Sequence, residues 1–129
     1  MSKECVQCPS GPPAGGPYSP VVRAGGFLFV SGQGPLARDG SGPVRGSIEE
    51  EARLTLDNLK AVLADADAGL EDVVKTTVYL ADMVNFTRFN DVYKTYFPEN
   101  QPARTCIQAG RLPLDFQVEI EAIAWVPEG

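Results

Sequence analysis

The sequence predicts one α+β domain in which a mixed β-sheet carries two helices on one face. Several stretches alternate apolar and polar residues as strands do, and two stretches repeat apolar residues at helical spacing. The predicted order is a hairpin, a helix, a strand, a second helix and two more strands. Because strand–helix–strand crossings are right-handed, we expect parallel strands in one sheet with both helices on the same face. At 129 residues, one domain is the expected number.

The N-terminal third of the chain is rich in turns, because residues 1–46 hold most of the 13 Gly and 11 Pro residues. We expect residues 1–14 to form a flexible arm and residues 15–129 to form the single domain. The segments 21–24 and 27–31 flank Gly25-Gly26, which predicts a tight β-hairpin.

The first helix is predicted to begin at a capping box, because Ser47 is followed three residues later by Glu50. Apolar residues then recur at helical spacing, and Gly69 provides the stop. The acidic residues at 49–51 are interpreted as a solvated helix start, where the helix dipole favours negative charge.

A buried strand is predicted at 73–80, where β-branched residues are frequent. Phe86, Phe89, Tyr93 and Phe97 form a second helical stripe that is interpreted as core and that ends at Pro98. Two more strands follow at 103–109 and 116–125, and the last alternates most clearly. No element remains to cover the second face of the sheet. We therefore expect another subunit to cover it.

Composition excludes several classes of function. The chain has no histidine, which rules out Ser-His-Asp and Cys-His nucleophilic sites, His general bases and His-ligated metals. The net charge of −6 argues against binding to nucleic acid. Apolar runs are too short to span a membrane, and no charged-then-apolar leader opens the chain. We expect a cytoplasmic protein that needs no metal.

Two motifs suggest a metal site and a nucleotide site, but their sequence context argues against both. Cys5 and Cys8 form a Cys-x-x-Cys pair, but with Cys106 the chain has three cysteines, too few for a zinc site without histidine. The segment 32–37 fits the dinucleotide pattern G-x-G-x-x-A, yet Pro35 and the glycines that follow prevent the helix that would bind the pyrophosphate. We therefore interpret the cysteines as reduced thiols and exclude nucleotide binding.

Arg104, Glu119 and Glu121 are the candidate chemical groups. The two glutamates lie two apart in a strand and so share a face, while Arg104 shares a face with Cys106 and Gln108. Each of these three charged residues, considered alone, is typical of an exposed protein surface. Together, an arginine fork can hold a carboxylate and a nearby glutamate can orient water, so a site for a small anion attacked by water is allowed.

Six short segments in fixed order resemble the Rid (YjgF) family of enamine and imine deaminases, also described as translation inhibitors or L-PSP ribonucleases. The resemblance covers residues 15–126 and rests on the segments 16–19, 29–33, 58–63, 72–80, 102–106 and 118–124. It implies a chorismate-mutase-like α+β fold and a homotrimer with sites between subunits. It also implies hydrolysis of 2-aminoacrylate and 2-iminopropanoate, formed by pyridoxal-phosphate enzymes, to pyruvate and ammonia without a cofactor.

The resemblance also assigns roles to individual residues. Arg104 would bind the substrate carboxylate and Glu119 would position the attacking water, which the backbone carbonyl of Cys106 would help to hold. The implied supporting residues are Tyr18, which would line the pocket, the Ser31–Gly32 backbone, which would fix the substrate, and Asn90, as structural support. Pro20 and Gly34 depart from the family pattern beside the expected pocket, which leaves the preferred substrate size open.

Two alternatives stay open at the level of sequence. The first is an endoribonuclease or translation inhibitor, against which the negative charge and the missing histidine both argue. The second is a non-catalytic binder or chaperone that uses the same clefts between subunits.

Overall fold

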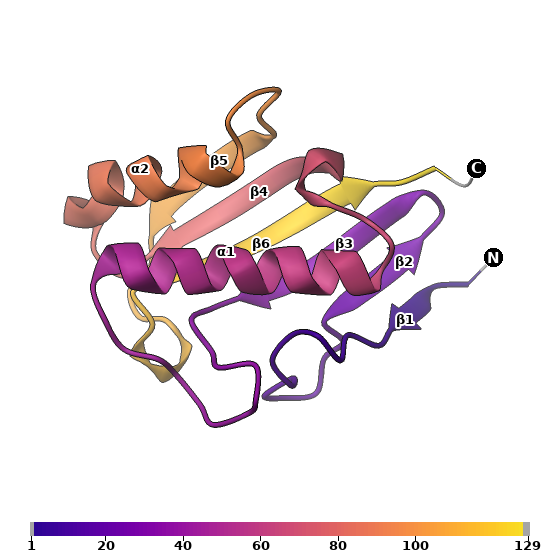
Figure 1. Cartoon of the computed structure of the whole chain (residues 1–129), viewed down its shortest axis with the longest axis horizontal. Helices are drawn as coiled ribbons and strands as arrows, with labels where there is room; N and C mark the ends of the chain where they lie inside the picture. The colour runs from indigo at the N-terminus through magenta and orange to yellow at the C-terminus, as the bar shows by residue number, and fades with distance from the viewer. Residues whose placement is uncertain (1, 128–129) are drawn as a thin grey trace.

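The computed structural model describes residues 2–127, and within this range the chain forms a six-stranded mixed sheet covered on one face by two α-helices (Figure 1). The elements are β1 (Glu4–Val6), β2 (Val21–Ala24), β3 (Phe27–Gln33), α1 (Ile48–Asp65), β4 (Val73–Leu80), α2 (Phe86–Tyr96), β5 (Ala103–Gln108) and β6 (Val118–Trp125). The predicted α+β class, with both helices on one face, is confirmed.

The C-terminal strand lies in the middle of the sheet, whose order is β1-β2-β3-β6-β4-β5. β6 pairs antiparallel with both β3 and β4, so these two strands run parallel to one another without touching. The crossover through α2 joins β4 to β5, which pair directly in parallel. Because β5 ends the sheet, one side of its backbone has no partner strand among the described residues.

The first helix begins at the predicted capping box. The Ser47 hydroxyl accepts from the Glu50 backbone N–H (3.1 Å), and the Glu50 carboxylate accepts from the Ser47 N–H (2.9 Å). The helix ends at Asp65, four residues before Gly69. The interpretation of the acidic segment as solvated is wrong for Glu51, which is only 3% exposed. Its carboxylate accepts from the backbone and side-chain N–H groups of Gln117, at 3.0 and 2.7 Å, and so joins α1 to the start of β6.

Residues 2–14, where a flexible arm is predicted, contain an edge strand and a hydrogen-bonded turn. β1 pairs antiparallel with β2, which otherwise would present an open edge. Ser10 donates its backbone N–H and its hydroxyl to Asp65 at the end of α1, both at 2.8 Å. The Cys8 thiol is buried beside Val62, and this burial raises its pKa to about 11. It therefore stays a protonated thiol at neutral pH.

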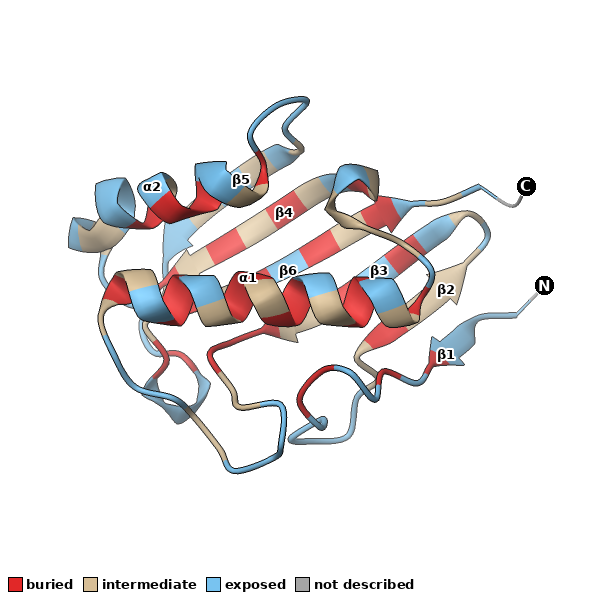
Figure 2. Ribbon diagram, in the orientation of Figure 1, coloured by how far each residue is buried: buried red, intermediate tan, exposed pale blue. Residues whose placement is uncertain are grey.

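The hydrophobic core lies between the sheet and the helices. Alternate residues of β4 and β6 are buried beneath the helices, and the residues between them face the other side (Figure 2). We call that other side the open face. Phe27, Phe29, Ile123 and Trp125 form an apolar cluster on it, in which Phe27 lies opposite Trp125 and Phe29 opposite Ile123. Phe29 and Trp125 are 45% and 50% exposed, which agrees with the expectation of an uncovered face.

Candidate functional site

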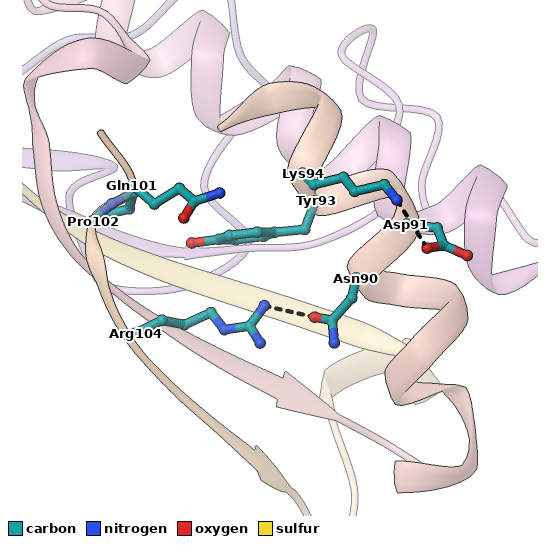
Figure 3. A pocket seen from close by; sticks show the side chains of 7 residues that line it. All are labelled: Asn90, Asp91, Tyr93, Lys94, Gln101, Pro102 and Arg104. Atoms are coloured by element: carbon teal, nitrogen blue, oxygen red, sulfur yellow. Dashed lines mark hydrogen bonds and ion pairs between the residues drawn. The ribbon is translucent and has the colours of Figure 1, made fainter. Parts of the chain in front are cut away.

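Arg104 projects from the edge strand β5 toward α2. Its position opposite Thr76 of β4 places it on the helix-covered face of the sheet. The guanidinium donates to the Asn90 side-chain oxygen at 2.8 Å and lies under the Tyr93 ring, 4.8 Å from its centroid (Figure 3). Phe86 is a second aromatic neighbour at 5.7 Å. The three partners lie on one face of α2, because positions 86, 90 and 93 are spaced by four and three residues.

These contacts fix the plane of the guanidinium and leave part of it facing an open cavity of about 460 Å³. The cavity is lined by Asn90, Asp91, Tyr93, Lys94, Gln101, Pro102 and Arg104. Tyr93 is itself held in place, because its hydroxyl shares a 2.8 Å hydrogen bond with Thr76. Burial raises the pKa of Tyr93, so the phenol beside the guanidinium stays neutral. A planar arginine with spare donors suits a small carboxylate.

A second cavity, of about 400 Å³, lies on the open face. Its lining residues come from β3, from β6 and from the turn before β2, and they are Tyr18, Val30, Ser31, Gly32, Glu119 and Glu121. The Ser31 hydroxyl donates to the Ser19 carbonyl at 2.6 Å, and the Tyr18 hydroxyl accepts from the Gly15 N–H at 3.2 Å. These bonds fix the turn that carries Tyr18 against β3.

Glu119 is the half-buried acid of this second cavity. Its partial burial raises its pKa, and the neighbouring carboxylate of Glu121 raises it further. The carboxylate lies directly over Gly32, where a Cβ atom would collide with it. Glycine at position 32 therefore makes the room in which the Glu119 side chain sits. A half-buried carboxyl group in a cavity can donate a proton to a bound molecule or accept one from it.

The predicted site residues fall into two groups that one chain does not bring together. Arg104, with Asn90 and Cys106 nearby, lies on the helix-covered face at the sheet edge. Tyr18, Ser31, Gly32 and Glu119 gather on the open face, as the resemblance implies for one side of a pocket. Arg104 lies opposite Thr76 on the helix-covered face, whereas Glu119 lies opposite Tyr79 on the open face, so the two side chains point away from each other.

Cys106 shares the face of Arg104, as expected from their spacing. Ala109 donates its backbone N–H to Leu80 of β4, and the alternation of a parallel strand then directs the backbone groups of Cys106 away from β4, toward the open edge. Its carbonyl is thus placed to accept from a molecule at that edge. Burial raises the pKa of the Cys106 thiol, which argues against a role as a nucleophile.

Sequence reasoning missed three supporting residues. Tyr93 is part of the core, as predicted, and its ring also lies against Arg104. Phe86, predicted to be core, is 38% exposed and lies beside the same guanidinium. Their spacing around Asn90 on one helical face was the available signal. Asn58 is buried and donates to the carbonyls of Gly34 and Leu36, both at 2.9 Å, which fixes the loop after β3. That loop contains no helix, as predicted from Pro35, and Gly34 lies against the Phe116 ring, where a side chain would collide.

Residues 2–127 contain no cluster of three or more His, Cys, Asp or Glu side chains that could hold a metal ion. Over the same range, no helix is long and apolar enough to cross a membrane.

Comparison with known proteins shows the family to which the chain belongs. The family model described as Endoribonuclease L-PSP matches residues 8–126. A RutC family protein of Pyrococcus abyssi is 43% identical over 97% of this chain and 98% of its own. The Escherichia coli protein named "Putative reactive intermediate deaminase TdcF" is 39% identical over 95% of this chain and 96% of its own. A crystal structure of E. coli TdcF with bound serine superposes with a TM-score of 0.89 at 38% identity, covering 95% of this chain and 98% of that one. The chain belongs to the Rid (YjgF) family.

Proposed function

We propose that this chain is an imine deaminase that hydrolyses 2-aminoacrylate and 2-iminopropanoate to pyruvate and ammonia. The observation that carries the proposal is the fixed guanidinium of Arg104, oriented by Asn90 and Tyr93 toward an open cavity. Such a group binds a planar carboxylate through two parallel hydrogen bonds. The name of TdcF as a reactive intermediate deaminase and the serine bound in its structure support a small substrate that resembles an amino acid.

The reaction needs orientation more than a nucleophilic side chain. A protonated imine carbon is already electrophilic, and an enzyme that holds it beside a positioned water converts a chance encounter into a nearly unimolecular step. Arg104 would bind the carboxylate, and Glu119 would orient the water and accept its proton. The Cys106 carbonyl would help to hold the water, and Tyr18 with the Ser31–Gly32 backbone would close the pocket. The absence of histidine removes none of these groups.

The site is proposed to form between copies of the chain in a homotrimer. Arg104 and Glu119 lie on opposite faces of one sheet, so a single small molecule reaches both only if they come from different copies. The apolar cluster on the open face supplies a surface that a second copy can cover, and the free edge of β5 carries Arg104 to that boundary. Each copy would then contribute Arg104 to one site and Glu119 to another.

The test is a coupled assay in which a serine or threonine dehydratase generates the imino acid and release of pyruvate or ammonia is followed. The chain should accelerate release, and Arg104→Ala should abolish the acceleration while the circular dichroism spectrum is unchanged. Arg104→Lys should also be poor, because an ammonium group does not reproduce the planar fork. The exposed Arg53→Ala serves as the matched control and should keep full activity. Full activity in Arg104→Ala would exclude this function.

The description Endoribonuclease L-PSP favours one rival function, cleavage of RNA. The net charge of −6 opposes it, because RNA binding depends on neutralising phosphates with Lys and Arg. RNA cleavage that co-purifies with the chain and disappears in Arg104→Ala and Glu119→Gln would support the nuclease. Binding of serine or pyruvate without turnover of any imino acid would instead support the non-catalytic binder.

A further inference from the structure

Glu121 and Tyr79 lie beside Glu119 on the open face, and neither has a role in the reaction proposed above. The Tyr79 hydroxyl donates to the Glu121 carboxylate at 2.6 Å. In the ladder between β4 and β6, Tyr79 lies directly opposite Glu119 and not opposite Glu121. Its side chain therefore reaches diagonally and holds Glu121 beside the half-buried acid. Glu119 and Glu121 both line the same 400 Å³ cavity.

Glu119 and Glu121 are the only charged residues among those that line the cavity. The remaining lining residues of the cavity are Tyr18, Val30, Ser31 and Gly32, none of which carries a positive charge. From β4, Glu119 faces Tyr79, and Glu121 faces the neutral Thr77. Lys75 lies further along β4, opposite Ile123, and its ammonium donates to Thr105 at 3.1 Å. Glu119 therefore meets a second carboxylate at close range with no compensating cation from its own chain among the residues that line the cavity.

The pKa of Tyr79 agrees with this arrangement of the two carboxylates. Its hydrogen bond to Glu121 is the main cause that raises its pKa to about 12, and the charges of both glutamates add to the effect. Tyr79 therefore stays protonated and remains a donor throughout the working range of an enzyme. Burial raises the pKa of Glu119, and the neighbouring Glu121, which the Tyr79 hydroxyl holds in place, raises it further.

We propose that Glu121, held by Tyr79, is a positioning residue that enables Glu119 to carry a proton from the attacking water to the departing nitrogen. The proposal rests on the proposed deaminase function. In the assembled site, Arg104 of the neighbouring copy would bring a positive charge toward Glu119. Glu121 would offset that charge, so that Glu119 could still gain and lose a proton.

The proposed reaction proceeds through a carbinolamine. Water attacks the carbon of the protonated imine, the carbon–oxygen bond forms, and the electrons of the carbon–nitrogen π bond move to nitrogen. Glu119 takes one proton from that water and passes it to the nitrogen of the resulting carbinolamine. The carbon–nitrogen bond then breaks with its electron pair on nitrogen, and the hydroxyl proton returns to Glu119 as the ketone forms. Glu119 releases that proton to the ammonia, so iminium and water become ketone and ammonium.

The first test needs no substrate. The chain is labelled with ¹³C at the glutamate carboxyl groups, and the Glu119 signal is assigned by its loss in Glu119→Gln. We expect Glu121→Gln to lower the pH midpoint of Glu119 titration and Tyr79→Phe to lower it by less, because Glu121 can then turn toward solvent. The exposed Glu99→Gln removes the same charge elsewhere and should leave the midpoint unchanged. An unchanged midpoint in Glu121→Gln would overturn the proposal even if the chain deaminates imino acids.

The second test is kinetic and uses the same variants. The acidic limb of the pH profile of kcat/KM should move to lower pH in Glu121→Gln, in step with the Glu119 midpoint. At pH 7, kcat should fall roughly tenfold, a moderate part of what general acid–base catalysis contributes. A merely structural role for Glu121 would reduce activity without moving the limb, and that result would also overturn the proposal. Failure of every variant and of the parent chain to deaminate would refute the proposed function and leave the titration result standing.

Discussion

Arg104 of β5 and Glu119 of β6 project from opposite faces of the same sheet, with β4 between their strands. Arg104 lies against α2, whereas Glu119 lines a cavity on the uncovered side. One small molecule cannot contact both side chains of a single chain in this geometry. Assembly is therefore part of the proposed chemistry, because the edge that carries Arg104 must meet the open face of another copy.

The apolar cluster on the open face should hold the assembly together. Phe29→Glu places a charge where burial against a second copy is expected, so it should dissociate the oligomer and abolish deaminase activity together. The measurement is light scattering coupled to size-exclusion chromatography. Val84→Glu is the matched control, because Val84 is 78% exposed next to α2 and should tolerate the change. An unchanged mass for Phe29→Glu would show that another surface makes the interface.

Gly32→Ala should reduce activity without unfolding the chain. A methyl group at this position would collide with the Glu119 carboxylate, which must then leave its place over Gly32. We expect kcat to fall about 10²-fold, the effect of misplacing a reacting group by about an ångström. Gly110→Ala meets no atom within 4 Å and provides the control. Equal activity in the two variants would mean that the position of Glu119 does not matter.

Glu51→Ala should destabilise the fold. The buried carboxylate accepts two hydrogen bonds from Gln117, and its removal leaves a backbone donor without a partner. The expected loss is roughly 2 kcal/mol in the free energy of unfolding, which urea denaturation would measure. The exposed Glu99→Ala should cost far less. Equal losses would indicate that Glu51 contributes only as a surface charge.

The ion pair between Glu49 and Arg88 should give stability a definite pH dependence. Arg88 donates to Glu49 at 2.6 and 2.8 Å, and these bonds lower the pKa of Glu49 from 4.5 to about 2. Because the folded-state pKa is depressed, the stabilisation is fully present above pH 4.5 and is lost as pH falls toward 2. Arg88→Ala should therefore lower Tm slightly at pH 7, and the difference from the parent chain should vanish near pH 2. A difference that persists at pH 2 would contradict this assignment.

Much of the fold could be predicted because local patterns dictated it. The capping box at Ser47, the Gly25-Gly26 turn and the alternation in β6 each act within a few residues, and each is found where expected. The insertion of β6 between β3 and β4 was not predicted, because strand order depends on contacts distant in sequence. The strand β1 was missed for a related reason. It forms only because β2 offers an edge and Val6 and Cys8 find buried positions.

The candidate site residues could be named from the sequence, but their arrangement in space could not be predicted. The family resemblance pointed to Arg104 and Glu119, and the structure places each in a cavity. Their placement on opposite faces follows from the register, because Arg104 lies opposite Thr76 and Glu119 lies opposite Tyr79, and no local pattern reveals these pairings. The buried role of Glu51 and the bond from Tyr79 to Glu121 were missed because both depend on partners tens of residues away. The cytoplasmic location stays a prediction.

The most direct test of a catalytic site shared between copies is complementation between two inactive variants. Arg104→Ala lacks the anchor and Glu119→Gln lacks the proton acceptor, so each should be inactive when purified alone. In trimers co-expressed from equal amounts of both, about a quarter of the sites should take an intact Arg104 from one copy and an intact Glu119 from its neighbour. Co-expression should therefore restore about that fraction of the deaminase activity of the parent chain. No recovery in verified mixed trimers would contradict a site shared between copies.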